Sequence, residues 1–174
     1  PQPRPIDDLM KILNLNLKAV GPFIDVVLDF SRGNHGLHVI LGANEAGKSS
    51  SLRALSYLFF GFPHRITDSF VHQPEKLRVG ASLQHHDGSV FEFIRRKATK
   101  NELRAGDDST IIEPGVLQRF LGGLDPESFH HRFGIDHGRL RMASEEIRTG
   151  KGYFGEMLFS AGAGLAGLRQ VQQI

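Results

Sequence analysis

The sequence predicts an α/β fold: a mixed sheet, an antiparallel layer beside it, and helices packed on the other side. Alternating apolar residues in segments 10–20 and 24–30, separated by a glycine-proline break, predict two strands paired with each other. A run of branched apolar residues at 37–41 is too short for a buried helix and predicts a fully buried strand. A glycine-rich loop follows, and from Ser50 the apolar residues take a helical spacing. This order of elements places the loop at the centre of the sheet.

The N-terminal end of the chain holds a leader and the first strand. Residues 1–9 are rich in proline and lack periodicity, so we expect a flexible leader there. In the strand that follows, Leu15, Leu17 and Ala19 fall on one face. One apolar face is typical of a half-buried strand, with the other face in contact with water.

The second half of the chain predicts a hairpin and two helices. Segments 77–83 and 90–94 alternate on either side of a His-Asp-Gly turn signal, which indicates a hairpin. Pro114 is well placed to open a helix because proline is favoured in the first helical turn. Asp125 and Pro126 have the order of a capping residue and a first-turn proline, which predicts a second helix.

A basic segment follows the hairpin. Its cations are Arg95, Arg96, Lys97, Lys100 and Arg104. Such a group can contact the phosphates of DNA. The acidic residues Glu92 and Glu102 partly offset its charge, so we favour the alternative, a solvated hairpin tip.

The loop after segment 37–41 carries the main functional signal. From Gly42 to Ser49 it spells G-x-x-x-x-G-K-S, the Walker A pattern of a phosphate-binding loop. The alternative is a chance match in a chain with 20 glycines among 174 residues, but the flanking strand and helix patterns argue against it. We predict that the phosphates of a nucleotide contact Gly42, Ala43, Asn44, Glu45, Ala46, Gly47, Lys48, Ser49 and Ser50.

The chemistry of polyphosphate binding requires these residue types. Gly42 and Gly47 lack Cβ atoms, so the backbone can bend tightly and bring its N–H groups against phosphate oxygens. The following helix points its positive end at the same place. Lys48 adds a full charge for the β- and γ-phosphates, and we predict a catalytic role for it. The Ser49 hydroxyl is the predicted protein ligand of Mg²⁺.

Composition excludes several classes of protein. The chain has 174 residues and no Cys, which rules out a disulfide scaffold and a thiolate zinc site. The absence of Cys also fits the cytoplasm, where we expect the chain. No apolar run approaches the ~20 residues of a membrane span, so we expect no membrane partner. The formal net charge is only +2, which says little about nucleic acid.

A phosphate-binding loop occurs in many classes of enzyme, so other motifs are needed to tell these classes apart. GTP-specific proteins carry an N/T-K-x-D motif, whereas residues 99–102 here read Thr-Lys-Asn-Glu and lack the Asp. A small-molecule kinase would show compact parallel βα units and an arginine-rich lid, but this chain has paired antiparallel strands around the loop. Both observations favour an ATPase of another kind.

From Met10 onward the sequence resembles the N-terminal lobe of SMC-like DNA-repair ATPases of the ABC class, of the SbcC/YhaN type. The resemblance is specific in NEAGKS at 44–49, and it extends to RFGIDHGRLR at 132–141 and LFSAGAGLAGL at 158–168. It implies half of an ATPase head at 10–152. It also implies a helical segment at 153–174, which we expect to be the truncated root of a coiled coil.

The same resemblance implies a set of cofactors and partners. ATP and Mg²⁺ would be bound between two heads in a head-to-head homodimer, each head completed by a C-terminal lobe of the same protein. A metallophosphoesterase nuclease and DNA are the further partners of that family. The family's γ-phosphate sensor, a Gln, corresponds to His137 here, and we predict a catalytic role for this residue near the γ-phosphate. A nucleotide-touching Arg of the family corresponds to Gly21.

Three functional hypotheses follow. The first is an ATP-binding half-head of a DNA-repair ATPase, a hydrolase in the full-length protein and inactive as this chain alone because it lacks a Walker B strand and a signature motif. The second is a self-sufficient P-loop nucleotide kinase or switch. The third is a non-enzymatic interaction module with a degenerate site.

Overall fold

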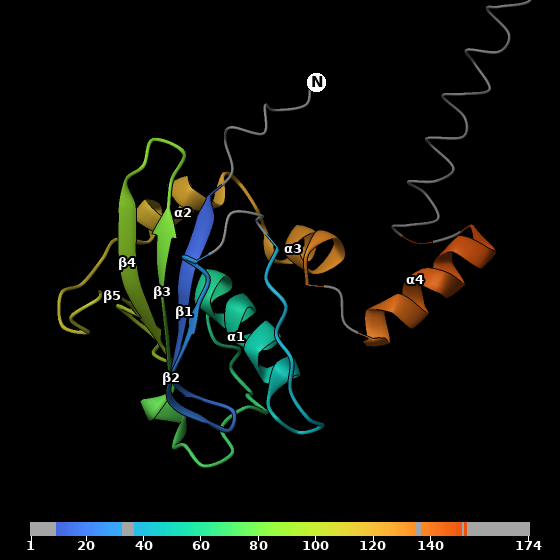
Figure 1. Ribbon diagram of the computed structural model, residues 1–174, viewed down its shortest axis with the longest axis horizontal. Coiled ribbons are helices and arrows are strands. Elements are labelled where there is room, and N and C mark those ends of the chain that lie inside the picture. The colour runs from blue at the N-terminus through green and yellow to red at the C-terminus, as the bar shows by residue number, and fades with distance from the viewer. Residues whose placement is uncertain (1–9, 33–36, 135–136, 151, 153–174) are drawn as a thin grey trace, which may run out of the picture. The chain divides into compact units, whose positions relative to one another are not determined.

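The computed structural model describes residues 10–32, 37–134, 137–150 and 152 (Figure 1). The predicted leader at 1–9 and the predicted coiled-coil root at 153–174 lie outside the described residues. The chain forms two compact units that divide after Phe129, and each unit is described by itself. The first unit contains the sheet and the glycine loop.

A five-stranded antiparallel sheet forms the first unit, with its strands in the order β2-β1-β3-β4-β5. The strands are β1 (Lys11–Val20), β2 (Phe23–Asp29), β3 (Arg78–Gln84), β4 (Val90–Arg96) and β5 (Leu103–Ala105). The pairing of β1 with β2 and of β3 with β4 confirms the predicted strand pair and hairpin. Together with the flanking helices this sheet confirms the predicted α/β class.

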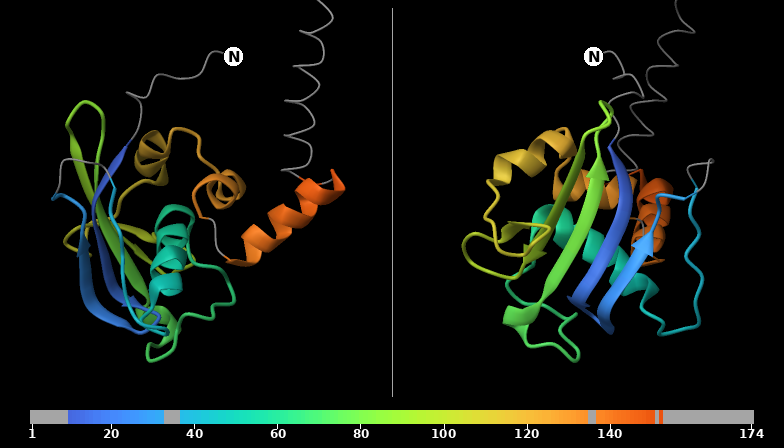
Figure 2. Two further views of the ribbon diagram at one scale, coloured as in Figure 1. Left: turned by 45° about the vertical axis from the view of Figure 1, so that its right-hand side comes forward. Right: turned by 60° about the vertical axis from the view of Figure 1, so that its left-hand side comes forward.

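Helix α1 (Lys48–Phe60) lies across one face of the sheet (Figure 2, left). Its Ala54 and Leu58 side chains are buried with residues from β1, β3 and β4. The shared core consists of Leu15, Leu17, Val20, Ala54, Tyr57, Leu58, Phe59, Val79, Ala81, Leu83, Phe93, Leu103, Leu117 and Phe129. Burial of these side chains against the helix fixes which face of the sheet carries α1.

One face of β1 departs from the predicted alternation. Leu15 and Leu17 are buried as expected, but the next fully buried residue is Val20 rather than Ala19. The register of β1 against β3 shifts between Asn16 and Ala19, the position of a β-bulge or an equivalent irregularity. An extra residue in a strand reverses the side-chain alternation, which accounts for the change.

The two predicted helix starts are confirmed. Helix α2 (Pro114–Leu121) begins at the expected proline, and α3 (Pro126–Arg132) begins after Asp125. The carboxylate of Asp125 accepts a hydrogen bond from the Ser128 N–H at 2.9 Å, as an N-terminal cap does. A short 3-10 helix, η2 (Pro74–Lys76), precedes β3.

The buried strand predicted at 37–41 is not formed. No described strand lies along this segment, and its large side chains are exposed, with Leu37 at 78% and Leu41 at 88%. Figure 2 (right) shows the segment in cyan, apart from the sheet. A strand of this composition is stable only where neighbouring strands satisfy its backbone and cover its side chains. The described residues offer it no such neighbour.

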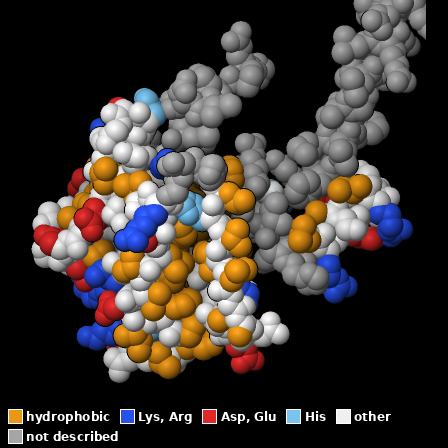
Figure 3. All heavy atoms as spheres, viewed as in Figure 1, with side chains coloured by type: hydrophobic (Ala, Val, Ile, Leu, Met, Phe, Trp, Pro, Cys, Tyr) orange, Lys and Arg blue, Asp and Glu red, His pale blue; other side chains and the backbone are white. Residues whose placement is uncertain are grey.

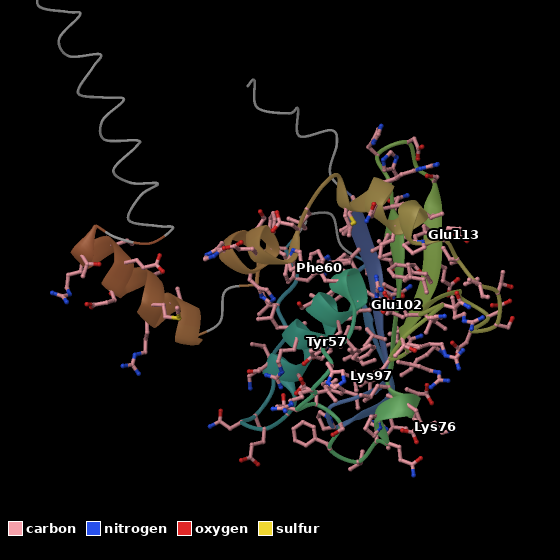
Figure 4. The ribbon with its side chains drawn as sticks, turned by 180° about the vertical axis from the view of Figure 1, so that it is seen from behind. Tyr57, Phe60, Lys76, Lys97, Glu102 and Glu113 are labelled. Atoms are coloured by element: carbon pink, nitrogen blue, oxygen red, sulfur yellow. The ribbon has the colours of Figure 1, made fainter. Side chains whose placement is uncertain are left out.

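The expectation of a solvated basic tip is wrong for Arg95. Its guanidinium is buried: Nε donates to the Leu58 carbonyl at 2.7 Å, Nη2 donates to the Phe59 carbonyl at 3.1 Å, and Nη1 pairs with Glu102. Figure 4 labels Glu102, which precedes β5. Strand alternation places Arg95 on the same face as the buried Phe93, towards α1. Burial lowers the pKa of Arg95, and the charge of Glu102 opposes that shift.

Among the described residues of the second unit, His137–Thr149 form helix α4, which the sequence patterns did not predict. Its apolar side chains Leu140, Met142 and Ile147 are exposed. Among the helices of the described residues, none has the length and apolar character needed to cross a membrane.

Candidate nucleotide site

The loop from Gly42 to Gly47 leads directly into α1, whose first residue is Lys48. Two of its residues take left-handed backbone conformations, Glu45 at φ 67° and Gly47 at φ 90°. The Ala46 N–H donates to the Ala43 carbonyl at 3.2 Å, which closes a tight turn. The start of a helix has unpaired N–H groups and a positive end, and here it is preceded by a compact loop open to solvent. This arrangement is able to bind an anion.

Lys48 spans the loop. Its Nζ donates to the carbonyl of Gly42 at 2.7 Å and to the carbonyl of Ala43 at 2.7 Å, and the side chain is exposed. An ammonium group has three donors, so one remains for a ligand. Lys48 thus bonds to both carbonyls, and the Ala43 carbonyl also accepts the Ala46 N–H.

Steric contacts explain why Gly47 is a glycine. A Cβ atom at this position would lie 2.4 Å from Cζ of Phe23, the first residue of β2. The backbone of Phe23 is itself held by His72, whose Nε2 lies 2.7 Å from the Phe23 carbonyl oxygen. The Phe23 ring therefore packs against the loop and leaves room only for glycine at position 47.

We expect Gly47→Ala to lower the free energy of unfolding by ~1–3 kcal/mol, because it combines a strained φ with an overpacked contact. Chemical denaturation measures this loss. The same substitution in a Phe23→Ala background serves as the control: the clash is gone there and only the cost of the positive φ remains. Equal losses in both backgrounds would show that Phe23 does not restrict the loop.

A buried polar cluster lies beside α1, next to the loop. Its centre is Asp68, which is wholly buried and belongs to the segment that connects α1 to η2 in the sequence. The carboxylate accepts hydrogen bonds from Arg53, Tyr57 and Ser50, and Figure 4 labels Tyr57 on α1. Burial alone would raise the pKa of Asp68, but the hydrogen bonds from Arg53 and Tyr57 outweigh burial and lower it. Nothing in the sequence pattern singles out this residue, although Arg53 and Tyr57 are spaced to share a helix face.

The predicted site residues divide into two groups. Those from Gly42 to Ser49 lie together in the loop and the first turn of α1, and all but the half-buried Gly47 are exposed. Ser50 is buried, and its hydroxyl donates to Asp68, so only its backbone faces the loop. His137 begins α4 in the second unit, and its side chain lies outside the described residues. Its role near a γ-phosphate stays a prediction.

The polar groups of the loop and of the first turn of α1 fit a nucleoside triphosphate and Mg²⁺. Backbone N–H groups, a helix N-terminus and the spare donor of Lys48 match phosphate oxygens. The exposed hydroxyl of Ser49 matches a single oxygen ligand of Mg²⁺, which keeps most of its other ligands from water and phosphate. The class of protein that this fold and loop define is a P-loop nucleotide-binding domain.

Comparison with known proteins narrows the class to a family. A family model described as an AAA domain matches residues 10–174, and the chain belongs to that family of ATPase domains. Nucleotide binding, usually with Mg²⁺, is a property of the family.

Two curated relatives show what else the chain is similar to. It is 26% identical over 154 residues to the uncharacterized protein YhaN of Bacillus subtilis strain 168, covering 87% of this chain and 15% of that protein. It is 39% identical over 70 residues to mitogen-activated protein kinase 9 of Arabidopsis thaliana, covering 39% of this chain and 14% of that protein. The chain thus spans about 15% of the length of these curated relatives.

Proposed function

We propose that the chain is the ATP-binding N-terminal head lobe of an SMC-like ATPase of DNA repair or processing, completed by a C-terminal lobe of the same protein. The observation that carries the proposal is the loop Gly42–Gly47, closed by Lys48 and set at the N-terminus of α1. The similarity to YhaN over 87% of this chain supports it. Within this proposal, residues 10–152 form the half-head and 153–174 begin the coiled coil.

In this function the residues of the loop and of the first turn of α1 surround the phosphates of ATP. The N–H groups of the loop and of the first turn of α1 bind the phosphates, and Lys48 offsets the charge of the β- and γ-phosphates. Ser49 holds Mg²⁺, which supplies charge neutralisation between the β- and γ-phosphates when it is bound. His137 is proposed as the γ-phosphate sensor, by its place in the resembling sequence.

The exposed segment 37–41 supports the need for a second lobe. Four large apolar side chains, those of Leu37, Val39, Ile40 and Leu41, directly precede the loop and are exposed. Figure 3 shows apolar side chains gathered on one face of the molecule. Burying one such side chain stabilises by ~1.5–3 kcal/mol, so a strand added from a C-terminal lobe would gain substantially by covering this segment. A cytoplasmic location and the partners named from the resemblance, namely a second head, a metallophosphoesterase nuclease and DNA, belong to this proposal.

We expect this chain alone to bind ATP without appreciable turnover. Phosphoryl transfer depends on stabilising charge around the γ-phosphate and on an oriented water, and both would come from the second lobe and an opposing head. A steady-state ATPase assay on the purified chain measures this, with Lys48→Ala as the control for contaminating ATPases. Activity that arises only when the C-terminal lobe is added would support the proposal.

Robust turnover by the wild-type chain that disappears in Lys48→Ala would overturn the half-head proposal. It would favour the second hypothesis, a self-sufficient P-loop kinase or switch. A folded chain that binds no ATP at all would favour the third hypothesis, an interaction module with a degenerate site.

A further inference from the structure

The Asp68 carboxylate accepts hydrogen bonds from three residues on one face of α1. It accepts from Arg53 Nε at 2.6 Å, from Arg53 Nη2 at 2.5 Å, from Tyr57 Oη at 2.7 Å and from Ser50 Oγ at 3.3 Å. Positions 50, 53 and 57 are three and four residues apart, so they lie on one stripe of the helix. A single buried carboxylate therefore fixes the first two to three turns of α1.

The backbone of Asp68 bonds to a third segment. Its carbonyl accepts the N–H of Gly21 at 2.7 Å, in the turn between β1 and β2. Gly21 has φ 55°, and a Cβ there would lie 3.0 Å from the Cβ of Ser50. The turn, the segment after α1 and the first turn of α1 thus meet at Ser50, the residue next to Ser49.

We propose that Asp68 is a positioning residue for the nucleotide: it holds the first turn of α1 in the orientation that presents Lys48 and Ser49 to the phosphates. The inference rests on the proposed ATP-binding function. Asp68 is wholly buried, so it acts through Ser50, Arg53 and Gly21 and not by touching the ligand. A buried carboxylate is destabilised by the loss of each donor, so the cluster favours the arrangement that satisfies all of them and resists small rotations of the helix.

The opposite end of α1 provides a matched control. There Arg95 bonds to the Leu58 and Phe59 carbonyls and pairs with Glu102. Both clusters attach the helix to the rest of the unit through an ion pair with one buried member, Asp68 or Arg95, but only the Asp68 cluster adjoins the loop. If Asp68 merely stabilised the fold, breaking either pair would have the same consequence for nucleotide affinity.

The test compares Asp68→Asn with Glu102→Gln in the full chain, by denaturant unfolding and by calorimetric titration with Mg-ATP. Each substitution replaces a carboxylate by an amide of similar shape. We expect both to lower stability, but only Asp68→Asn to raise the Kd for ATP, by ~10-fold, the lower end of the loss seen when a residue that orients a metal ligand is removed. Glu102→Gln should leave the Kd within about twofold of wild type, since its cluster is remote from the loop.

Two milder variants keep the test decisive where Asp68→Asn folds poorly. Ser50→Ala and Tyr57→Phe each remove one hydroxyl donor to Asp68 and leave the Arg53 pair intact. We expect Ser50→Ala to weaken ATP binding more than Tyr57→Phe, because Ser50 lies in the first turn. Affinity losses that simply follow the stability losses of the variants would overturn the inference.

The inference and the proposed function fail in different ways. A wild-type chain that binds no ATP overturns both. A wild-type chain that binds ATP, together with an Asp68→Asn variant of unchanged affinity, overturns the positioning role alone.

Discussion

The Lys48→Ala variant is expected to lose ATP binding while it keeps its fold. Lys48 is the one residue of the segment 42–49 with a full positive charge, and it lies across the loop on two carbonyls. Its removal leaves several phosphate charges without a counter-charge and takes one donor from each of the Gly42 and Ala43 carbonyls. A charge-assisted hydrogen bond contributes ~1.5–3 kcal/mol, which corresponds to a ~10- to 150-fold rise in Kd. Calorimetric titration with Mg-ATP measures the change.

A matched control for this experiment is Lys76→Ala. Lys76 lies on η2, is exposed, and is labelled in Figure 4. Its replacement removes the same charge from the chain without touching the loop, so a general effect of net charge on ATP affinity would be visible in it. Unchanged ATP affinity in a folded Lys48→Ala variant would refute the assignment of the loop.

Local patterns were enough to predict most of the sheet and the helices of the first unit. Strand alternation and the Gly-Pro break located β1 and β2, and the His-Asp-Gly signal located the β3–β4 hairpin. Proline and aspartate placed the starts of α2 and α3. These signals are local, because a turn or a cap depends on a few consecutive residues and on their backbone preferences.

The segment 37–41 shows where local patterns fail. Its composition is that of a buried strand, but burial depends on neighbours from other parts of the chain, and no described strand covers it. The hydrophobicity of a segment indicates how much free energy its burial would contribute. It does not indicate whether another strand or helix is present to cover it. The same limit applies to β2, whose alternating residues Ile24 and Val26 are exposed.

Asp68 and Arg95 show a second limit. Both are charged residues that are buried because partners on α1 satisfy them, although Arg95 belongs to a segment that was predicted to be solvated. Asp68 reaches Arg53 across 15 residues, and Arg95 reaches Leu58 across 37. Contacts between residues this far apart in the sequence cannot be recognised from composition or from hydrophobic periodicity. The loop Gly42–Ser49 could be predicted because its function requires particular residues at a fixed spacing.

Arg95 and Arg96 are adjacent in sequence, and we expect their alanine variants to differ sharply in stability. Arg95→Ala leaves Glu102 without its partner, removes the donors of two buried helix carbonyls and opens space in the core. The cavity and the lost hydrogen bonds to buried carbonyls together are expected to cost ~3–5 kcal/mol, whereas Glu102 remains partly in contact with water. Arg96 lies on the opposite face of β4, half-buried, with Asp108 at 3.7 Å. A pair of this kind contributes ~0–1 kcal/mol, so Arg96→Ala should unfold almost like wild type.

Denaturant unfolding of the two variants, followed by circular dichroism, measures this difference. The comparison is matched because each variant loses one arginine from the same strand and the same net charge. A second variant, Arg95→Met, retains most of the buried volume and separates the cost of the cavity from that of the lost hydrogen bonds. If Arg95→Met regained the stability of wild type, the packing of the arginine stem would explain the whole effect. Equal losses in Arg95→Ala and Arg96→Ala would contradict the burial of Arg95 and its attachment to the end of α1.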